Sequence, residues 1–398
     1  MPSTAVLPPR PRRTLPGRDR AIDLYRSVAI IAVVLGHWLV IGIDGHGGRN
    51  LLQTDGWIHP LTWLFQVMPL VFVVAGWSNA HSWPGARQAR TWYRRRAGGF
   101  AGPVLVYLVA VEVAAALARL AGTNAEVAGD AAWLLRVHLW FVPVYLAVIA
   151  VTPLAVATAR RWGSRSVIAL VAVSAVLDLG RPSLLTWATV WLACHQIGVA
   201  WALGSLSERH STRLALAGGA AAVALVALGP WPLSMVGVPG SDRSNTGPPS
   251  IALLALGLAQ AGLAVGAAPA VRRWLGRSPT CASVVERVNA ASARLYLLHL
   301  VPVLIGACIL RLGLDAFPRV GTASWWALRP LWLVALALAL ASILTLTGRR
   351  GASAAADDQE RSAATVDTNR STALSEPRHP GPFTTTAKTA SRPPAVVR

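Results

Sequence analysis

An arginine and a histidine, Arg26 and His37, lie eleven residues apart inside the first long apolar stretch of the chain. Eleven residues of an α-helix turn through about 1100°, so the two side chains fall within roughly 20° of each other and about 16 Å apart along the axis. Asp23 precedes Arg26 by one helical turn and shares that stripe. Ionisable groups at membrane depth are costly and usually mark a working site. A neutral imidazole is a natural general base, which acyl transfer to a hydroxyl requires.

A structural interpretation of the same pair stays open at this point. His37 would then be a buried, hydrogen-bonded packing residue, and Arg26 an interfacial anchor whose guanidinium extends toward water. Spacing alone does not decide between the two interpretations, because both place the side chains on one face of one helix.

Five arginines, Arg87, Arg90, Arg94, Arg95 and Arg96, lie between the second and third apolar segments. Guanidinium groups form forked hydrogen bonds that suit phosphates, so this cluster is a candidate clamp for a phosphorylated donor such as acyl-CoA. The alternative is that these residues only orient the helices, since cytoplasmic loops of membrane proteins are rich in arginine and lysine.

Three further motifs place polar side chains in apolar segments. They are His138-Leu-Trp140-Phe-Val-Pro143, Trp191-x3-His195-Gln196 and Tyr296-Leu-Leu-His299. Tyr296 and His299, three residues apart, share a helix face. Each motif is compatible with polar contacts between helices or with the lining of a cavity.

The composition is that of a membrane protein. Of 398 residues, 54% are hydrophobic and 14% are charged, and the mean hydropathy is +0.48, which favours an integral membrane protein. The net charge of +20 is explained by basic loops, so no nucleic-acid partner is expected. Three cysteines predict neither a disulfide framework nor a zinc site, and no metal is expected. Abundant Ala, Arg and Gly with almost no Lys is typical of a GC-rich bacterial genome.

Ten apolar segments predict an all-α, polytopic fold with about ten transmembrane helices. Their approximate bounds are 22–43, 58–80, 100–121, 134–155, 166–179, 184–203, 211–229, 249–268, 293–313 and 324–347. We expect one membrane domain over 21–347, between a disordered basic N-terminus at 1–20 and a disordered cytoplasmic tail at 348–398. Asp23 and Arg26 interrupt the first segment, which favours a retained helix over a cleaved signal peptide.

Arginines concentrate before the first segment and after every second segment that follows. This alternation predicts a multi-pass protein of the plasma membrane with both termini in the cytoplasm. Arg26 would then lie near the cytoplasmic end of the first helix and His37 toward its outer half.

Four motifs, taken in chain order, resemble those of the integral-membrane acyltransferase family 3. They are Ile22–Arg26 with Val33–His37, Val71–Trp77, His138–Pro143 and Ser292–His299. The family also carries Arg-x-x-Arg at the start of its third helix. Here Arg96 is followed by Ala-Gly-Gly, and the matching spacing, Arg87-x-x-Arg90, lies further upstream.

The resemblance implies a ten-helix bacterial enzyme that moves an acyl group, acetyl in the simplest case, from cytoplasmic acyl-CoA to a hydroxyl of a carbohydrate, a lipid or a small natural product. Acyl-CoA is then a donor substrate, with no permanently bound cofactor. The catalytic histidine of the family corresponds to His37, which would be the general base. Its first-helix arginine corresponds to Arg26, whose rotamer Asp23 would fix.

On this interpretation Arg94, Arg95 and Arg96 would bind the CoA phosphates. The substrate cavity would be lined by Trp140, Tyr296 and His299. The main rival is a multi-pass transporter of a polar metabolite without covalent chemistry, because buried ionisable groups also line transport paths. A structural or sensory membrane protein is a third possibility.

Overall fold

The first apolar stretch forms a continuous helix, α1 (Arg20–Val40), in the computed structural model. The Asp19 carboxylate accepts hydrogen bonds from two backbone N–H groups of its first turn, which lack partners within the helix. This uninterrupted helix keeps Arg26 and His37 about 16 Å apart along the axis. The structure describes residues 19–44, 47–180, 184–311 and 318–348.

The predicted disordered segments, 1–20 and 348–398, fall almost wholly outside the described residues. Residues up to Leu344 form one compact unit, and a second unit begins at Thr345. The description below concerns the first unit.

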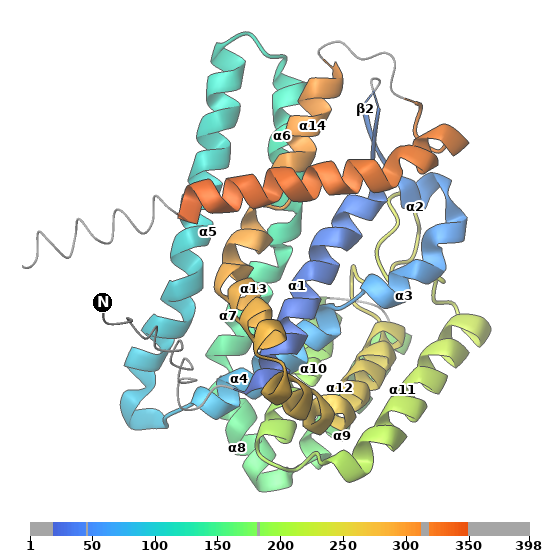
Figure 1. Cartoon of the computed structure of the whole chain (residues 1–398). Helices are drawn as coiled ribbons and strands as arrows, with labels where there is room; N and C mark the ends of the chain where they lie inside the picture. The colour runs from blue at the N-terminus through green and yellow to red at the C-terminus, as the bar shows by residue number, and fades with distance from the viewer. Residues whose placement is uncertain (1–18, 45–46, 181–183, 312–317, 349–398) are drawn as a thin grey trace, which may run out of the picture. The chain divides into compact units, whose positions relative to one another are not determined.

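Helices make up nearly all of the described chain, which confirms the all-α prediction (Figure 1). The longer helices are α4 (Met68–Ser82), α5 (Ala89–Leu120), α6 (Ala125–Arg136), α7 (Phe141–Ala150), α8 (Thr152–Trp162), α9 (Arg165–Gly180), α10 (Leu184–Ala202), α11 (Glu208–Leu228), α12 (Ile251–Arg277), α13 (Pro279–Leu298) and α14 (Val301–Arg311). The short ones are α2 (Leu51–Thr54), η1 (Gly56–Leu61), α3 (Thr62–Phe65), η2 (Ala86–Gln88) and η3 (Val137–Trp140). A last helix covers Ala323–Gly348.

The first helix ends at Val40, three residues before the predicted boundary at 43. The next residues form an antiparallel hairpin, β1 (Ile41–Asp44) with β2 (Gly47–Asn50). The β-branched residues and glycine of β1 favour this extended backbone over helix. The buried guanidinium of Arg329 donates to the backbone carbonyls of Trp38 and Ile41. It thereby satisfies acceptors that the end of α1 leaves without partners.

Two glycines allow α4 and α10 to cross with their backbones in contact. A Cβ atom on Gly76 would collide with the His195 carbonyl, and one on Gly198 would collide with the Val73 carbonyl. Small residues commonly allow such close packing between membrane helices. This crossing brings the C-terminal part of α4 next to His195 of α10.

Seven helices of the described chain are long and apolar enough to cross a membrane, and up to nine do so if each of two bent helix pairs counts as one span. The pairs are α8 with α9, bent by 115°, and α13 with α14, bent by 44°. The predicted number was about ten. The remaining predicted segment is α10, a helix of 19 residues whose His195 and Gln196 lower its hydropathy.

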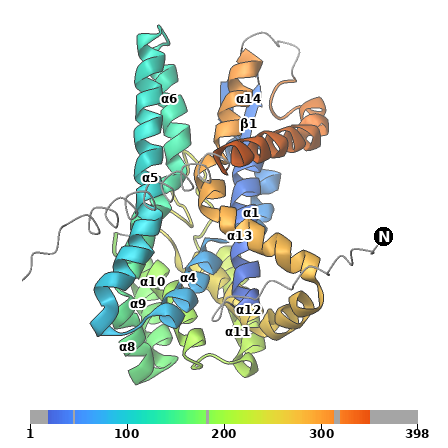
Figure 2. The same ribbon diagram turned by 60° about the vertical axis from the view of Figure 1, so that its left-hand side comes forward.

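Helix α1 packs beside α13, and α5 pairs with α6, as two views show (Figures 1 and 2). The last helix, starting at Ala323, passes across α1 and α14 (Figure 1). Its Trp325 donates to the Ile43 carbonyl, and its Trp332 lies against Gly306 of α14. Arg294 of α13 donates to the Leu344 carbonyl near its other end. The C-terminal end of α1 therefore packs in one apolar cluster with residues of α13, α14 and this helix.

Candidate active site

Three histidines from separate parts of the sequence gather around the C-terminal half of α1. Nδ1 of His37 lies 3.0 Å from Nε2 of His299, which directly follows α13. The ring of His138, in η3, lies 5.0 Å from the His299 ring in an edge-on arrangement. The His37 and His299 rings are also 5.0 Å apart between centroids. The chain thus joins the histidines of three of its four family-like motifs in one cluster.

His299 is fully buried and held from both its ring and its backbone. Its Nδ1 lies 2.8 Å from the carbonyl oxygen of Tyr296. The indole of Trp38 donates to the His299 carbonyl at 2.7 Å. His37 and Trp38 are adjacent in α1. His37 therefore contacts the side chain of His299 while Trp38 contacts its backbone.

His138 is 2% exposed, and neither of its ring nitrogens has a hydrogen-bond partner among the described residues. Its backbone is fixed, because the Tyr296 hydroxyl donates to the His138 carbonyl at 2.6 Å. A buried polar group normally has a partner. The described residues therefore leave both ring nitrogens of His138 without a hydrogen-bond partner, next to the ring of His299.

A second polar cluster lies at the other end of α1, around the last turn of α4. Arg26 donates from Nη2 to the Ser78 hydroxyl at 2.9 Å. Arg96 of α5 donates from Nε to the side-chain oxygen of Asn79 at 2.9 Å. The amide nitrogen of Asn79 lies 3.3 Å from Nε2 of His195. Two arginines from different helices therefore converge on adjacent residues of α4.

Asp23 contacts Arg26 as the helical spacing predicts. Its carboxylate lies 3.4 Å from Nη1 of Arg26, and it is buried whereas the arginine side chain is 39% exposed. A buried carboxylate in contact with the guanidinium limits the positions that the guanidinium can take.

The three arginines predicted to bind the donor do not behave alike. Arg94 and Arg95 are exposed, and Arg96 is partly buried against Asn79. They are consecutive on α5, so their side chains point in directions about 100° apart. Only Arg96 enters the polar cluster with Arg26.

Trp140, predicted to line the substrate cavity, lies in a group of aromatic side chains. Its ring centroid is 5.4 Å from that of Trp187 and 5.7 Å from that of Trp191. Tyr296 and His299, by contrast, belong to the histidine cluster. Trp140 follows His138 by two residues and is connected to that cluster through η3.

Sequence reasoning named the His138 motif but did not include His138 among the site residues, and it missed Ser78 and Asn79. The signal for His138 was its place in a motif that resembles the family. Ser78 and Asn79 directly follow Gly76-Trp77 of the second motif. An amide side chain inside an apolar helix could have marked Asn79 as a candidate for polar contacts between helices. Their hydrogen bonds with Arg26 and Arg96 depend on how the helices pack, so the sequence alone could not predict them.

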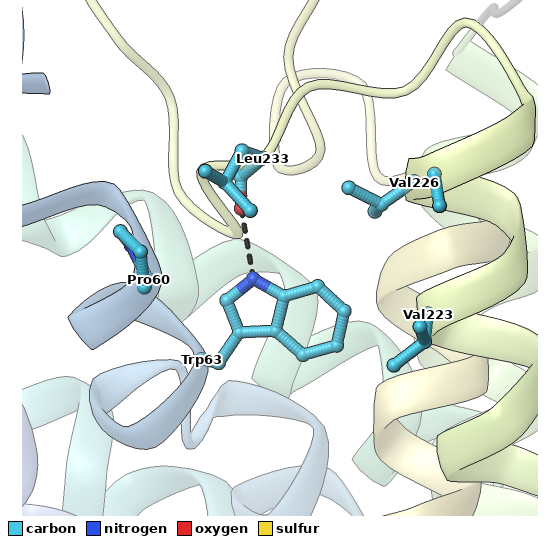
Figure 3. A pocket seen from close by; sticks show the side chains of 6 residues that line it. Pro60, Trp63, Val223, Val226 and Leu233 are labelled. Atoms are coloured by element: carbon cyan, nitrogen blue, oxygen red, sulfur yellow. Dashed lines mark hydrogen bonds between the residues drawn. The ribbon is translucent and has the colours of Figure 1, made fainter. Parts of the chain in front are cut away.

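An apolar surface groove of about 520 Å³ lies away from both polar clusters. It runs between α11 and the consecutive short helices η1 and α3 (Figure 3). Trp63 forms one wall and donates from its indole to the Leu233 carbonyl at 2.8 Å. Val223 and Val226 of α11 face it across the groove (Figure 3). None of the predicted site residues lines this groove.

No group of three or more His, Cys, Asp or Glu side chains within the described ranges is arranged to hold a metal ion.

The chain matches the model of one protein family, described as an acyltransferase domain, over residues 19–348. No curated protein and no solved structure matches the chain. The matched region includes all the helices described above, both polar clusters and all four motifs. Such a domain implies acyltransferase activity, and the apolar helices place it in a membrane. The chain therefore belongs to the membrane-bound acyltransferase family 3.

Proposed function

We propose that this protein transfers an acyl group, acetyl in the simplest case, from acyl-CoA to a hydroxyl of a carbohydrate, a lipid or a small natural product. His37 acts as the general base on the acceptor hydroxyl. The observation that supports this proposal best is the contact between His37 and His299 at 3.0 Å. His299 is fully buried, so this contact fixes the orientation of the His37 ring. A general base needs such a fixed position relative to the proton that it removes.

His138 provides the second reactive contact of the site. A neutral imidazole carries one N–H group, and neither nitrogen of His138 is used by the protein within the described residues. That N–H can donate to the thioester carbonyl oxygen, which becomes negative as the acceptor attacks. Removing one such donor typically reduces turnover about 10²- to 10³-fold.

Arg26 and Arg96 bind the phosphates of the donor. Both converge on adjacent residues of α4, and a guanidinium can hold a phosphate through two hydrogen bonds. The cluster lies about 16 Å along α1 from His37. A donor anchored there extends its thioester arm along the protein interior toward the histidines. Arg94 and Arg95, which are exposed, add positive potential at the entrance.

The arginine-rich end of the protein faces the cytoplasm, where acyl-CoA is found. The basic loops after the second, fourth, sixth and eighth predicted segments support this orientation through the positive-inside rule. Both termini of the chain then lie in the cytoplasm of a cell whose plasma membrane holds the protein.

Label transfer tests the proposed reaction. The full chain in lipid nanodiscs is incubated with acetyl-CoA labelled in the acetyl group and with a panel of hydroxylated glycans, lipids and small molecules. We expect labelled ester and an equal amount of free CoA. His37→Ala should reduce the rate about 10²- to 10⁴-fold, the usual contribution of a general base.

His210→Ala is the matched control, because His210 is an exposed histidine on α11. It should retain parental activity, and both variants should be checked for membrane insertion and monodispersity. Equal transfer by the His37→Ala variant would exclude His37 as the base. Accumulation of unmodified solute in proteoliposomes, without ester formation, would instead favour a transporter.

A further inference from the structure

The position of one proton in the histidine pair can be deduced from the neighbours of His299. Nδ1 of His299 lies 2.8 Å from the Tyr296 carbonyl oxygen. A carbonyl oxygen only accepts hydrogen bonds, so this contact requires a proton on Nδ1. Tyr296 lies in the last turn of α13, which ends at Leu298, where carbonyls lack intrahelical donors. The imidazole therefore supplies a donor that this carbonyl needs.

The other nitrogen of His299 is then an acceptor. His299 is fully buried, and none of the ion pairs formed by the described residues includes it or His37. A buried imidazolium without a carboxylate would be strongly disfavoured. With its single proton on Nδ1, a neutral His299 presents a lone pair at Nε2. Nδ1 of His37, 3.0 Å away, must donate to it.

The proton on His37 is thereby assigned as well. A neutral imidazole has one N–H group, so donation from Nδ1 leaves a free lone pair at Nε2.

We propose that His299 is a positioning residue, which fixes the tautomer of His37 so that Nε2, and not Nδ1, is the basic atom. This inference rests on the proposed function of His37. It assigns His299 a role other than lining a cavity, because its Nε2 is used by His37 and its Nδ1 by Tyr296. Trp38 holds its backbone in addition.

Proton and acyl movements balance with Nε2 of His37 as the base. Its lone pair takes the proton of the acceptor hydroxyl while the hydroxyl oxygen bonds to the thioester carbonyl carbon. The carbon–sulfur bond then breaks, and the leaving thiolate takes the proton back from Nε2. The products are an ester and free CoA. Throughout, Nδ1–H remains bonded to His299, whose lone pair stabilises the transient imidazolium.

Nitrogen NMR tests the tautomer directly. The full chain, labelled with ¹⁵N-histidine and reconstituted in lipid, gives separate signals for protonated and unprotonated ring nitrogens. The His37 signals are identified by their loss in the His37→Ala variant. We expect a protonated Nδ1 and an unprotonated Nε2 in the parent protein. In His299→Phe we expect a mixture of tautomers. A parent His37 protonated at Nε2 would overturn the proposal.

Kinetics of two variants separate positioning from packing. In His299→Phe, kcat should fall roughly 10²-fold while the KM values for donor and acceptor stay within about twofold, since the loss concerns the base and not substrate contacts. In His299→Gln, the amide oxygen can accept from Nδ1–H of His37, so kcat should recover to within about tenfold of the parent. Equal losses in both variants, with the His37 tautomer unchanged, would show that His299 only packs.

His210→Phe is the matched control, as it changes an exposed histidine in the same way, and it should leave kcat and the tautomer of His37 unchanged. The two proposals also fail differently. A parent protein with the assigned tautomer but no acyl transfer would refute the proposed reaction and uphold the role of His299. Acyl transfer by a protein whose His37 exchanges freely between tautomers would support the proposed reaction and refute the role of His299.

Discussion

At the scale of single residues, the two ends of one stripe on α1 have different partners. Arg26 contacts Asp23 of its own helix and Ser78 of α4. His37 contacts His299. The separation between them matches the division expected of an enzyme that holds a long donor by its phosphates and reacts at its distant thioester. The two groups lie on one helix, so their spacing does not depend on packing between helices.

Replacing Arg96 should weaken donor binding selectively. A hydrogen bond to a charged group contributes about 1.5–3 kcal/mol, so Arg96→Gln should raise the KM for acetyl-CoA roughly tenfold or more. The exposed Arg95 provides a matched control, and Arg95→Gln should change this KM about twofold or less. Steady-state kinetics with acetyl-CoA measure both.

Acetyl-pantetheine, which lacks the nucleotide phosphates, identifies the group that Arg96 recognises. With this donor, Arg96→Gln should behave like the parent protein. An equal loss with both donors would mean that Arg96 acts through Asn79 on the fold and does not bind phosphate.

Local sequence patterns predicted the helix that carries Asp23, Arg26 and His37, but not the contacts that these residues make with other helices. The spacing of Asp23, Arg26 and His37 was readable because a helix has a fixed period. The contact with His299 was not, since it joins residues that are 262 positions apart through the packing of α1 on α13. The difference between the partly buried Arg96 and the exposed Arg95 also required the structure. A run of consecutive arginines does not show which side chain faces the protein interior.

At the scale of elements, the glycine contact between α4 and α10 determines where Asn79 and His195 meet. Gly76→Val places a side chain against the His195 carbonyl, where no space exists. Overpacking typically costs about 1–3 kcal/mol, and more is expected here because the obstacle is backbone. We expect a lower melting temperature in detergent and a loss of activity.

Gly99→Val is the control for this substitution, because a Cβ on Gly99 of α5 meets no atom within 4 Å. It should leave the melting temperature within a few degrees of the parent. If both glycine variants were equally stable, the close crossing of α4 and α10 would be wrong.

Arg329 of the last helix connects that element to α1. It is 4% exposed, donates to carbonyls at the end of α1 and stacks over the Trp325 ring at 4.4 Å. Arg329→Met removes these donors and should lower stability by a few kcal/mol, because each buried carbonyl left without a donor costs about 1–3 kcal/mol. Arg329→Lys should recover only part of the lost stability, because an ammonium group lacks the planar, forked set of N–H donors of a guanidinium. Thermal unfolding in detergent measures both variants, and equal stability of Met and parent would contradict the capping role.

At the scale of the whole molecule, the sequence predicted a helical membrane protein with about ten spans, and the described residues contain seven to nine candidate spans and α10. Segment 166–179 is the second half of a helix pair bent by 115°. The bend follows Gly163, which has a positive φ of 56°, a conformation that glycine readily adopts. The polar residues of α10 obscure a helix whose centre is buried. Both segments form helices, but one is bent against its neighbour and the other carries buried polar residues, so neither is the straight, uniformly apolar helix that hydropathy detects best.

The last helix, Ala323–Gly348, decides on which side of the membrane the chain ends. Its 26 residues extend about 39 Å, more than the roughly 30 Å of a bilayer core, so it can cross while tilted over α1 and α14. We expect green fluorescent protein fused after Arg398 to fluoresce and alkaline phosphatase fused there to be inactive, as for a cytoplasmic end. Fusions at Asn245, after α11, should give the opposite pattern. An active phosphatase at Arg398 would mean that this helix lies along the membrane surface and that the two termini face opposite sides.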